Sequence, residues 1–299
     1  MRLRALSLLI LPLLTLPAYA DSVTLGSASS FGLLGGTVSN TGTSVVTGNV
    51  GATITNTGFP PGTATGFVCP PSCAAGDTTA VTAAYNAVFG TSGAFSTAEG
   101  LTSTGTFTGL ASQIFVANTS GDTVIASPGT ISTVTGINLT FDAGSNPAPI
   151  FIIQVPGAFT VNGVMTFTLG SGVQADNIFW IIEGSATSGV PADATISIGS
   201  SPAITFDGNI IAGDAFTMSA GSGGTGVLDG TINGCVFARN ANTLAGQTDV
   251  GGCANTSAGG TGGTGGTGGT VPEPGSMTLL GSGLIALVGL VRSRRARAF

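Results

Sequence analysis

The residues of this sequence that come closest to a catalytic set are four charged side chains: Asp207, Asp214, Asp229 and Arg239. Clustered carboxylates can hold calcium, and a basic group beside them can abstract a proton, as cleavage of a polysaccharide would require. The three aspartates are separated along the chain, however, and Arg239 is the only basic residue outside its two ends. The chain also lacks histidine and lysine. We therefore predict that these acids shape turns, and that the protein is not an enzyme and has no metal or cofactor.

The remaining polar chemistry comes from neutral side chains. With 13 acidic and 7 basic residues the chain carries a net charge of −6, which argues against nucleic acid as a partner. The segment TVNGVMTFTL, residues 160–169, alternates apolar with small polar residues. This alternation predicts a β-strand with Met165 and Phe167 facing a core and Thr166 and Thr168 facing outward. Threonine thus occupies positions where solvent-facing strands usually carry lysine or glutamate.

The same alternation recurs along the chain and predicts many short strands joined by glycine-rich turns. Such strands fit either a sandwich or an irregular β-solenoid. The continuous apolar runs Ile150–Val155 and Ile178–Ile182, the second of which contains Trp180, predict strands buried on both faces where a helix covers the sheet. On the alternating strands, the outward polar positions are candidate binding residues: Thr160, Asn162, Thr166, Thr168, Thr205, Thr217, Ser219, Thr231 and Asn233.

One segment, Gly76–Gly90, has helical rather than strand periodicity. Asp77 can cap a helix there and Gly90 can end it. Apolar residues recur at helical spacing between them: Val81, Ala84, Tyr85 and Val88. We expect a single helix packed on a β body.

The N-terminus predicts export. Residues 1–20 combine two arginines, an apolar run and the small-residue pattern Ala18-Tyr19-Ala20, which together indicate a secretory signal peptide cut before Asp21. Export makes disulfides plausible, and four cysteines allow three pairings. The pairing between cysteines nearest in sequence joins Cys69 to Cys73 and Cys235 to Cys253. A zinc site is the weaker interpretation of the same four residues.

The C-terminus contains a sorting segment. Residues 256–270 form a flexible Gly/Thr-rich linker by composition, and an apolar segment, Met277–Val291, precedes a cluster of arginines. With Pro272-Glu273-Pro274 as its motif, region 271–299 resembles the PEP-CTERM signal of Gram-negative bacteria. The resemblance implies recognition and removal by an exosortase after transient membrane anchorage, and a location at the cell surface, on the outer membrane or in the extracellular matrix. An ordinary C-terminal anchor is the alternative.

Between these ends, residues 21–255 resemble one family. Leu25–Ala52, Ile137–Val155, Ala175–Thr187 and Phe206–Ala238 are similar to the ice-binding protein-like domain known as DUF3494. The resemblance implies a mainly β fold, an irregular right-handed β-solenoid with one long α-helix packed alongside. Ice binders of the family use one flat face with a loose pattern of Thr, Ala or Gly, any residue, then Thr or Asn. Thr135-Gly136-Ile137-Asn138 matches this pattern completely, which adds Thr135 and Asn138 to the candidate residues.

These observations predict an exported, antifreeze-like protein that adsorbs to ice. Stacked parallel strands hold equivalent side chains at a fixed spacing, and β-branched threonine is stiff, so a threonine ladder presents methyls and hydroxyls in a preordered lattice for water. The alternative is a surface or exopolysaccharide-matrix adhesin that uses the same rod without ice activity. Threonine and asparagine also suit solenoid strands and turns without any binding role.

Overall fold

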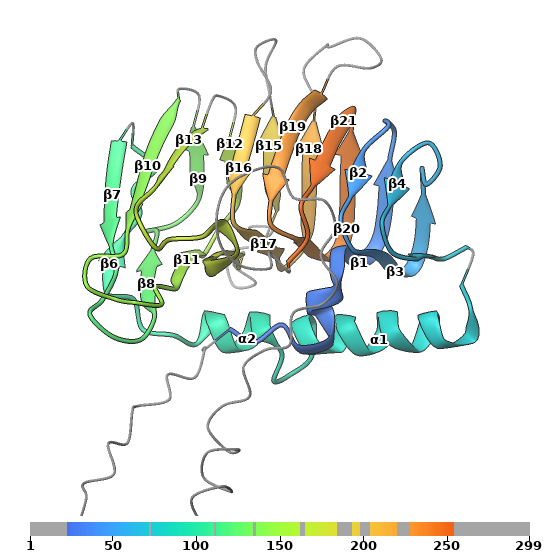
Figure 1. The fold of residues 1–299 in the computed structure, drawn as a ribbon, viewed down its shortest axis with the longest axis horizontal. Coiled ribbons are helices and arrows are strands. Elements are labelled where there is room, and N and C mark those ends of the chain that lie inside the picture. The colour runs from blue at the N-terminus through green and yellow to red at the C-terminus, as the bar shows by residue number, and fades with distance from the viewer. Residues whose placement is uncertain are drawn as a thin grey trace, which may run out of the picture. The chain divides into compact units, whose positions relative to one another are not determined.

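The structure is a computed structural model that describes residues 23–71, 73–110, 112–133, 136–161, 165–183, 193–197, 204–219 and 228–253. In these residues the chain winds into a parallel β-solenoid whose strands form three faces, with helices along one of them (Figure 1). The expectation of a solenoid with a helix alongside is thus confirmed.

The helix-covered face consists of nine strands, three of which continue onto a second face. Its pairing order begins at one end of the solenoid with β6 and β8 and ends at the other with β3 and β5. The strands, in spatial order, are β6 (Gly105–Thr106), β8 (Thr123–Ala126), β11 (Phe151–Val155), β14 (Ile178–Ile182), β17 (Asn209–Ala212), β20 (Val236–Ala245), β1 (Phe31–Asn40), β3 (Asn49–Thr57) and β5 (Val68–Cys69).

The second face, named here the continuous face, is an unbroken row of seven paired strands. The long strands β20, β1 and β3 contribute their second halves to it, because β1 shifts register between Gly35 and Thr37 against both neighbours. The four remaining strands are β9 (Ile131–Thr133), β12 (Phe159–Val161), β15 (Ala194–Ser197) and β18 (Ala215–Ser219).

The third face, named here the divided face, consists of two separate sheets. Figure 1 shows its strands following one another from one end of the solenoid to the other. The first sheet contains β7 (Ser112–Val116), β10 (Ile137–Asp142) and β13 (Met165–Leu169). The second contains β16 (Ile204–Asp207), β19 (Leu228–Asn233), β21 (Gln247–Val250), β2 (Val45–Val46) and β4 (Thr63–Ala64).

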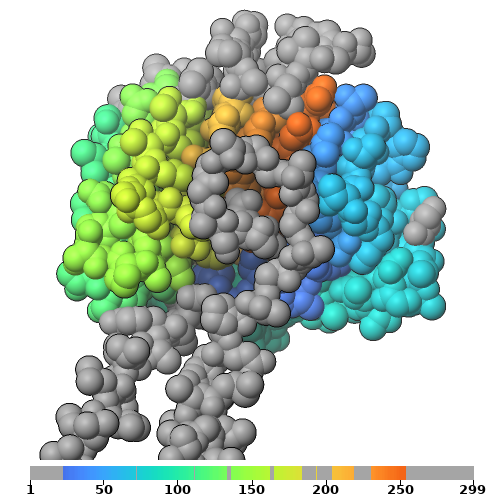
Figure 2. Space-filling model, in the orientation of Figure 1, coloured from blue at the N-terminus to red at the C-terminus, as the bar shows by residue number. Residues whose placement is uncertain are grey.

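The order of strands in space differs from their order in the sequence. β1 pairs in parallel with β20, so that Leu33 lies opposite Val236 and Ser39 opposite Thr243. Figure 2 shows the blue N-terminal segment against the orange C-terminal segment, with the green segment at the opposite end.

Two disulfides, Cys69–Cys73 and Cys235–Cys253, confirm the sequence-local pairing.

Two helices return the chain from the β5 end to the β6 end. α1 (Ala75–Phe89) is the predicted helix, and Gly90 is its C-cap. Asp77 lies inside the first turn rather than at the cap, where its carboxylate accepts a hydrogen bond from Ala74 N at 3.0 Å. A second short helix, α2 (Ala94–Glu99), was not expected. At 1.5 Å per residue the two helices span about 30 Å, which covers most of the stacked strands.

Burial divides into two layers. The interior of the solenoid is rich in aromatic rings, and Trp180 at its centre is fully buried, as predicted. The second layer lies between the helices and the helix-covered face, where Val81, Ala84 and Val88 of α1 pack. β11 and β14 are consequently buried on both faces, which confirms the prediction from their apolar runs. Two 3₁₀ helices complete the described elements: Gly26–Ser30 and Ala175–Asn177.

Among the described residues, no helix is long and apolar enough to cross a membrane. The apolar segment Met277–Val291, predicted to insert transiently, lies outside those residues, as do the signal peptide and the sorting motif.

Candidate functional site

The acids of the solenoid make local structural contacts. Asn233 Nδ2 donates to Asp207 Oδ1 at 2.7 Å, and Val45 N donates to Asp249 Oδ1 at 2.9 Å. Burial raises the pKa of Asp207, and the hydrogen bond from Asn233 lowers it in part. In the part of the chain that the structure describes, no group of three or more His, Cys, Asp or Glu could hold a metal ion. Asp207 and Asp249 therefore connect neighbouring strands and turns.

Arg239, the only basic residue outside the two ends of the chain, connects the helices to the solenoid. Its guanidinium carbon lies 5.6 Å from the ring centroid of Phe89 and 5.1 Å from that of Phe95. Its backbone carbonyl accepts a hydrogen bond from the Tyr85 hydroxyl at 2.9 Å. These contacts hold α1 and α2 against β20.

Glu183, at the end of β14, has the most perturbed carboxyl group of the described residues. Burial raises its pKa to about 7, and the nearby charge of Glu99 on α2 adds to the shift. One carboxylate oxygen of Glu183 is buried without a hydrogen-bond partner. The group is therefore a source of pH-dependent stability.

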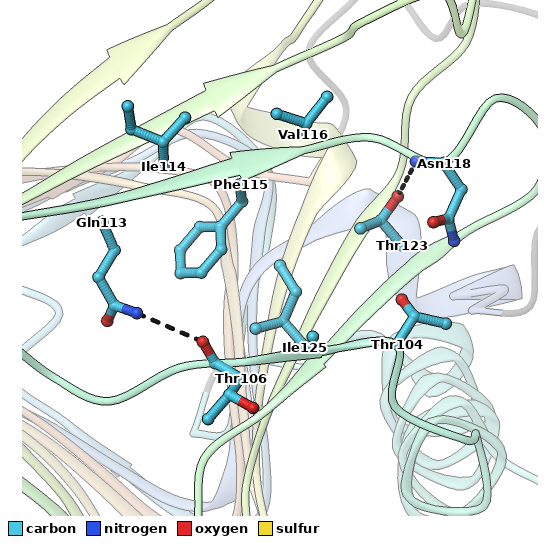
Figure 3. Close-up of a pocket in the computed structure, with 10 residues that line it drawn as sticks. Thr104, Thr106, Gln113, Ile114, Phe115, Val116, Asn118, Thr123 and Ile125 are labelled. Atoms are coloured by element: carbon cyan, nitrogen blue, oxygen red, sulfur yellow. Dashed lines mark hydrogen bonds between the residues drawn. The ribbon is translucent and has the colours of Figure 1, made fainter.

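A hollow of about 300 Å³ lies at the β6 end of the solenoid (Figure 3). The side chains of Phe115 and Ile125 lie at its centre, and hydroxyl and amide groups surround them. Gln113 Nε2 donates to the Thr106 carbonyl at 3.3 Å, and Asn118 N donates to Thr123 Oγ1 at 2.7 Å. None of the ten lining residues is charged, so the hollow offers no acid or base.

The most regular arrangement of polar residues is a column along the continuous face. The register of each strand pair places one threonine or serine opposite the next, from β9 at one end to β3 at the other. We call this column the hydroxyl ladder. Its members, in spatial order, are Ser132, Thr160, Thr195, Thr217, Thr243, Ser39 and Thr57.

The ladder residues whose side chains are described face away from the core. Thr160 and Thr217 are partly exposed, whereas the residues on either side of each are buried. Ser132 and Thr57, at the two ends of the ladder, are exposed. With strands about 4.8 Å apart, seven positions extend over about 29 Å. The result is a neutral row of small, mostly β-branched side chains on a single sheet.

The predicted candidates fall on two faces. Thr160 and Thr217 belong to the ladder, and Ser219 lies two residues further along β18. On the divided face, Asn138 aligns with Thr166, Thr140 with Thr168, and Thr205 with Thr231. Asn233 on the same face is hydrogen-bonded to Asp207. Thr135 and Asn162 lie outside the described residues, so the complete pattern match contributes Asn138 to the divided face.

Five members of the ladder were not among the predicted site residues. They are Ser132, Thr195, Thr243, Ser39 and Thr57. Ser39 and Thr243 each lie between two buried residues, as in Asn242-Thr243-Leu244, and this period of two is the signal that could have found them.

Comparisons with known proteins agree with this architecture. The chain is 29% identical over 282 residues to an ice-binding protein of Nostoc sp. strain HG1, covering 90% of this chain and 87% of that protein. A crystal structure of an ice-binding protein from the Antarctic ascomycete Antarctomyces psychrotrophicus is 27% identical, with a TM-score of 0.57, over 76% of this chain and 96% of that one. An ice-binding protein from an Antarctic biological consortium is 26% identical, with a TM-score of 0.55, over 76% and 90% of the respective chains.

The fold defines a class, the parallel β-solenoids that carry a helix along one face. The model of the ice-binding-like family matches residues 33–249, and the chain belongs to that family. A second model, the PEP-CTERM protein-sorting motif, matches residues 270–295 and indicates export in a Gram-negative bacterium. Both resemblances noted in the sequence are thus confirmed.

Proposed function

We propose that this protein adsorbs to ice through the continuous face, with the hydroxyl ladder at its centre. The observation that carries the proposal is the unbroken register of seven serine and threonine positions on one sheet. Family membership and the ice-binding relatives support the same function. The role is binding without covalent chemistry, and it requires no cofactor.

The physical basis is preorganisation. Backbone hydrogen bonds fix the spacing of the strands, and β-branched side chains have few rotamers to lose. Methyl and hydroxyl groups at fixed spacing can therefore hold water in an ordered arrangement at low entropic cost. Many weak, repeated contacts then add up over the length of the ladder.

The divided face is the poorer candidate for three reasons. Its strands form two sheets with no pairing between β13 and β16, so its columns are interrupted. Large apolar side chains are exposed on it, with Ile114 at 68% and Val116 at 56%. Its strands also contain aspartates, Asp142 and Asp249, whose hydration opposes an ordered water layer, whereas the strands of the continuous face contain no acidic residue.

The remaining expectations for cell location become part of the proposal. A signal peptide over residues 1–20 starts export, and the C-terminal region 271–299 anchors the chain transiently before an exosortase cleaves it. The linker over residues 256–270 then separates the domain, residues 21–255, from the envelope. The sorting-motif match supports this sequence of events, as does the pair of disulfides.

The test compares one threonine on each open face. Replacing Thr160 by Tyr places a bulky ring in the ladder, and replacing Thr205 by Tyr makes the same change on the divided face. We expect Thr160→Tyr to abolish most of the thermal hysteresis and ice shaping, and Thr205→Tyr to retain them. Circular dichroism checks that both variants fold.

The opposite result would assign the site to the divided face. Retention of activity by both variants would place the site elsewhere on the solenoid. A folded wild-type protein that neither shapes ice nor adsorbs to it would refute the proposal and favour the matrix adhesin.

A further inference from the structure

A second column of outward positions accompanies the hydroxyl ladder, two residues earlier on each strand. Ala215 precedes Thr217 on β18 and is paired with Ala241, which precedes Thr243 on β20. Ala158, just before β12, has the same relation to Thr160, and its carbonyl accepts a hydrogen bond from Ile131 N at 2.9 Å. At one end the column continues with Thr37 and Thr55, which are paired with each other. These positions carry small, uncharged side chains.

Asp193 is the exception in this column. It directly precedes Ala194, which pairs with the buried Phe159 on β12 and the buried Phe216 on β18. By the alternation of a strand, Asp193 therefore shares the outward side with position 195, opposite Ala158 and Ala215. The Phe159 N–H donates to the Asp193 carbonyl at 2.9 Å, which fixes the backbone in this register.

The carboxylate of Asp193 is held in place at the border of the face. It accepts a hydrogen bond from the backbone N–H of Ala215, and it lies close enough to Asp214 for the two charges to repel each other. Asp214 has a compensating donor, because Asn240 Nδ2 is hydrogen-bonded to it. Asp193 thus places an anionic group two residues from the ladder, directly before β15, the third of its seven strands.

An ionised carboxylate binds its own water strongly, and its removal from bulk water is costly. Water around Asp193 is therefore oriented by the charge and not by the neighbouring methyl and hydroxyl groups. Adsorption to a neutral crystal of water gives the carboxylate no counter-charge in return.

We propose that Asp193, at the border of the continuous face, limits the affinity of the ladder for ice; this inference rests on the proposed function. A neutral side chain at position 193 completes the small-residue column and strengthens adsorption. The chain thus carries a moderated binding surface that one substitution improves.

The experiment compares Asp193→Asn with wild type and with a matched control, Asp142→Asn. Asparagine keeps an oxygen that can accept from Ala215 N while removing the charge. Asp142 is an exposed aspartate on the divided face whose Oδ1 accepts from Gly144 N at 2.9 Å, so its replacement makes the same chemical change away from the ladder. Adsorption is measured as the fraction of protein incorporated into a slowly growing ice hemisphere, together with thermal hysteresis, at pH 8.

At a fixed protein concentration, we expect Asp193→Asn to increase incorporation into ice by about two- to fivefold, which is the size of effect that one partly exposed charge has on an equilibrium constant. Asp142→Asn should match wild type. If folded Asp193→Asn is no more active than wild type, the inference about Asp193 is overturned. The proposed function still stands in that case, provided that wild type adsorbs to ice. An equal gain in Asp142→Asn would also overturn it, because net charge and not position would then be the cause. Failure of wild type and Asp193→Asn alike to adsorb would instead refute the proposed function.

Discussion

Removal of the disulfide between Cys235 and Cys253 should destabilise the fold more than removal of the disulfide between Cys69 and Cys73. Cys235 precedes β20 and is fully buried, and Cys253 follows β21 with its sulfur 3.3 Å from the Phe31 carbonyl. This disulfide therefore closes the last strands of the domain beside the first. The other joins β5 to the segment that leads into α1.

The expected magnitude follows from loop length. The paired cysteines are 18 residues apart in the first disulfide and 4 apart in the second. Restriction of the unfolded chain by these loops contributes about 3 kcal/mol and about 2 kcal/mol respectively to the free energy of unfolding. For a domain of this size, about 2 °C of melting temperature corresponds to 1 kcal/mol, so the losses are about 6 °C and about 4 °C.

The assay is thermal unfolding followed by circular dichroism for two double variants, Cys235→Ala with Cys253→Ala and Cys69→Ala with Cys73→Ala. Wild type treated with a phosphine reductant loses both disulfides without a cavity at Cys235, so its melting temperature should fall by more than that of either variant. We expect the first variant to melt lower than the second. A first variant as stable as wild type, or more stable than the second, would contradict the loop-closure reasoning.

Two further predictions concern a carboxyl group and a turn. Because burial and Glu99 raise the pKa of Glu183 from 4.5 to about 7, the folded protein binds more protons than the unfolded chain between these values, and its stability falls as pH rises through this window. Glu183→Gln should flatten that decline, which urea denaturation at pH 4.5 and pH 7 measures; an unchanged slope would show that another group causes it. Gly58 has φ +85° and a Cβ there would lie 1.7 Å from the Asn40 carbonyl, whereas Gly121 has φ +70° and open space around it. Each alanine should lower the free energy of unfolding by at least about 1 kcal/mol because of the backbone conformation. Gly58→Ala should also lower the urea denaturation midpoint more than Gly121→Ala does. Equal midpoints for the two variants would show that the turn at Gly58 relaxes.

Sequence patterns predicted the strands of this protein because burial here depends on local alternation. Ile137, Leu139 and Phe141 are buried and Asn138 is exposed, as a period of two requires. The helix was predicted for the same reason, since Val81, Ala84 and Val88 lie on one side of α1. The short α2 was missed because six residues with a single aromatic side chain give too little periodicity to separate a helix from a loop.

The candidate site was less predictable, because alternation separates inward from outward positions but does not say which of the outer faces a side chain joins. Thr160 and Thr205 have the same local pattern, yet one lies on the continuous face and the other on the divided face. Ser39 and Thr243 are 204 residues apart and become neighbours only through the pairing of β1 with β20. No local property of either segment encodes that register.

The pairing of β1 with β20 also means that the ladder depends on the whole fold. Five of its positions come from residues 132–243, and the last two come from the first strands of the chain. Loss of the contact between β1 and β20 would therefore shorten the ladder from seven positions to five even if both parts kept their strands. Because repeated weak contacts act together over the full length, a binding surface of this kind loses activity when its ends separate, before the individual strands unfold. The disulfide Cys235–Cys253 lies beside this junction, because it joins the residue before β20 to a residue whose sulfur contacts the Phe31 carbonyl at the start of β1.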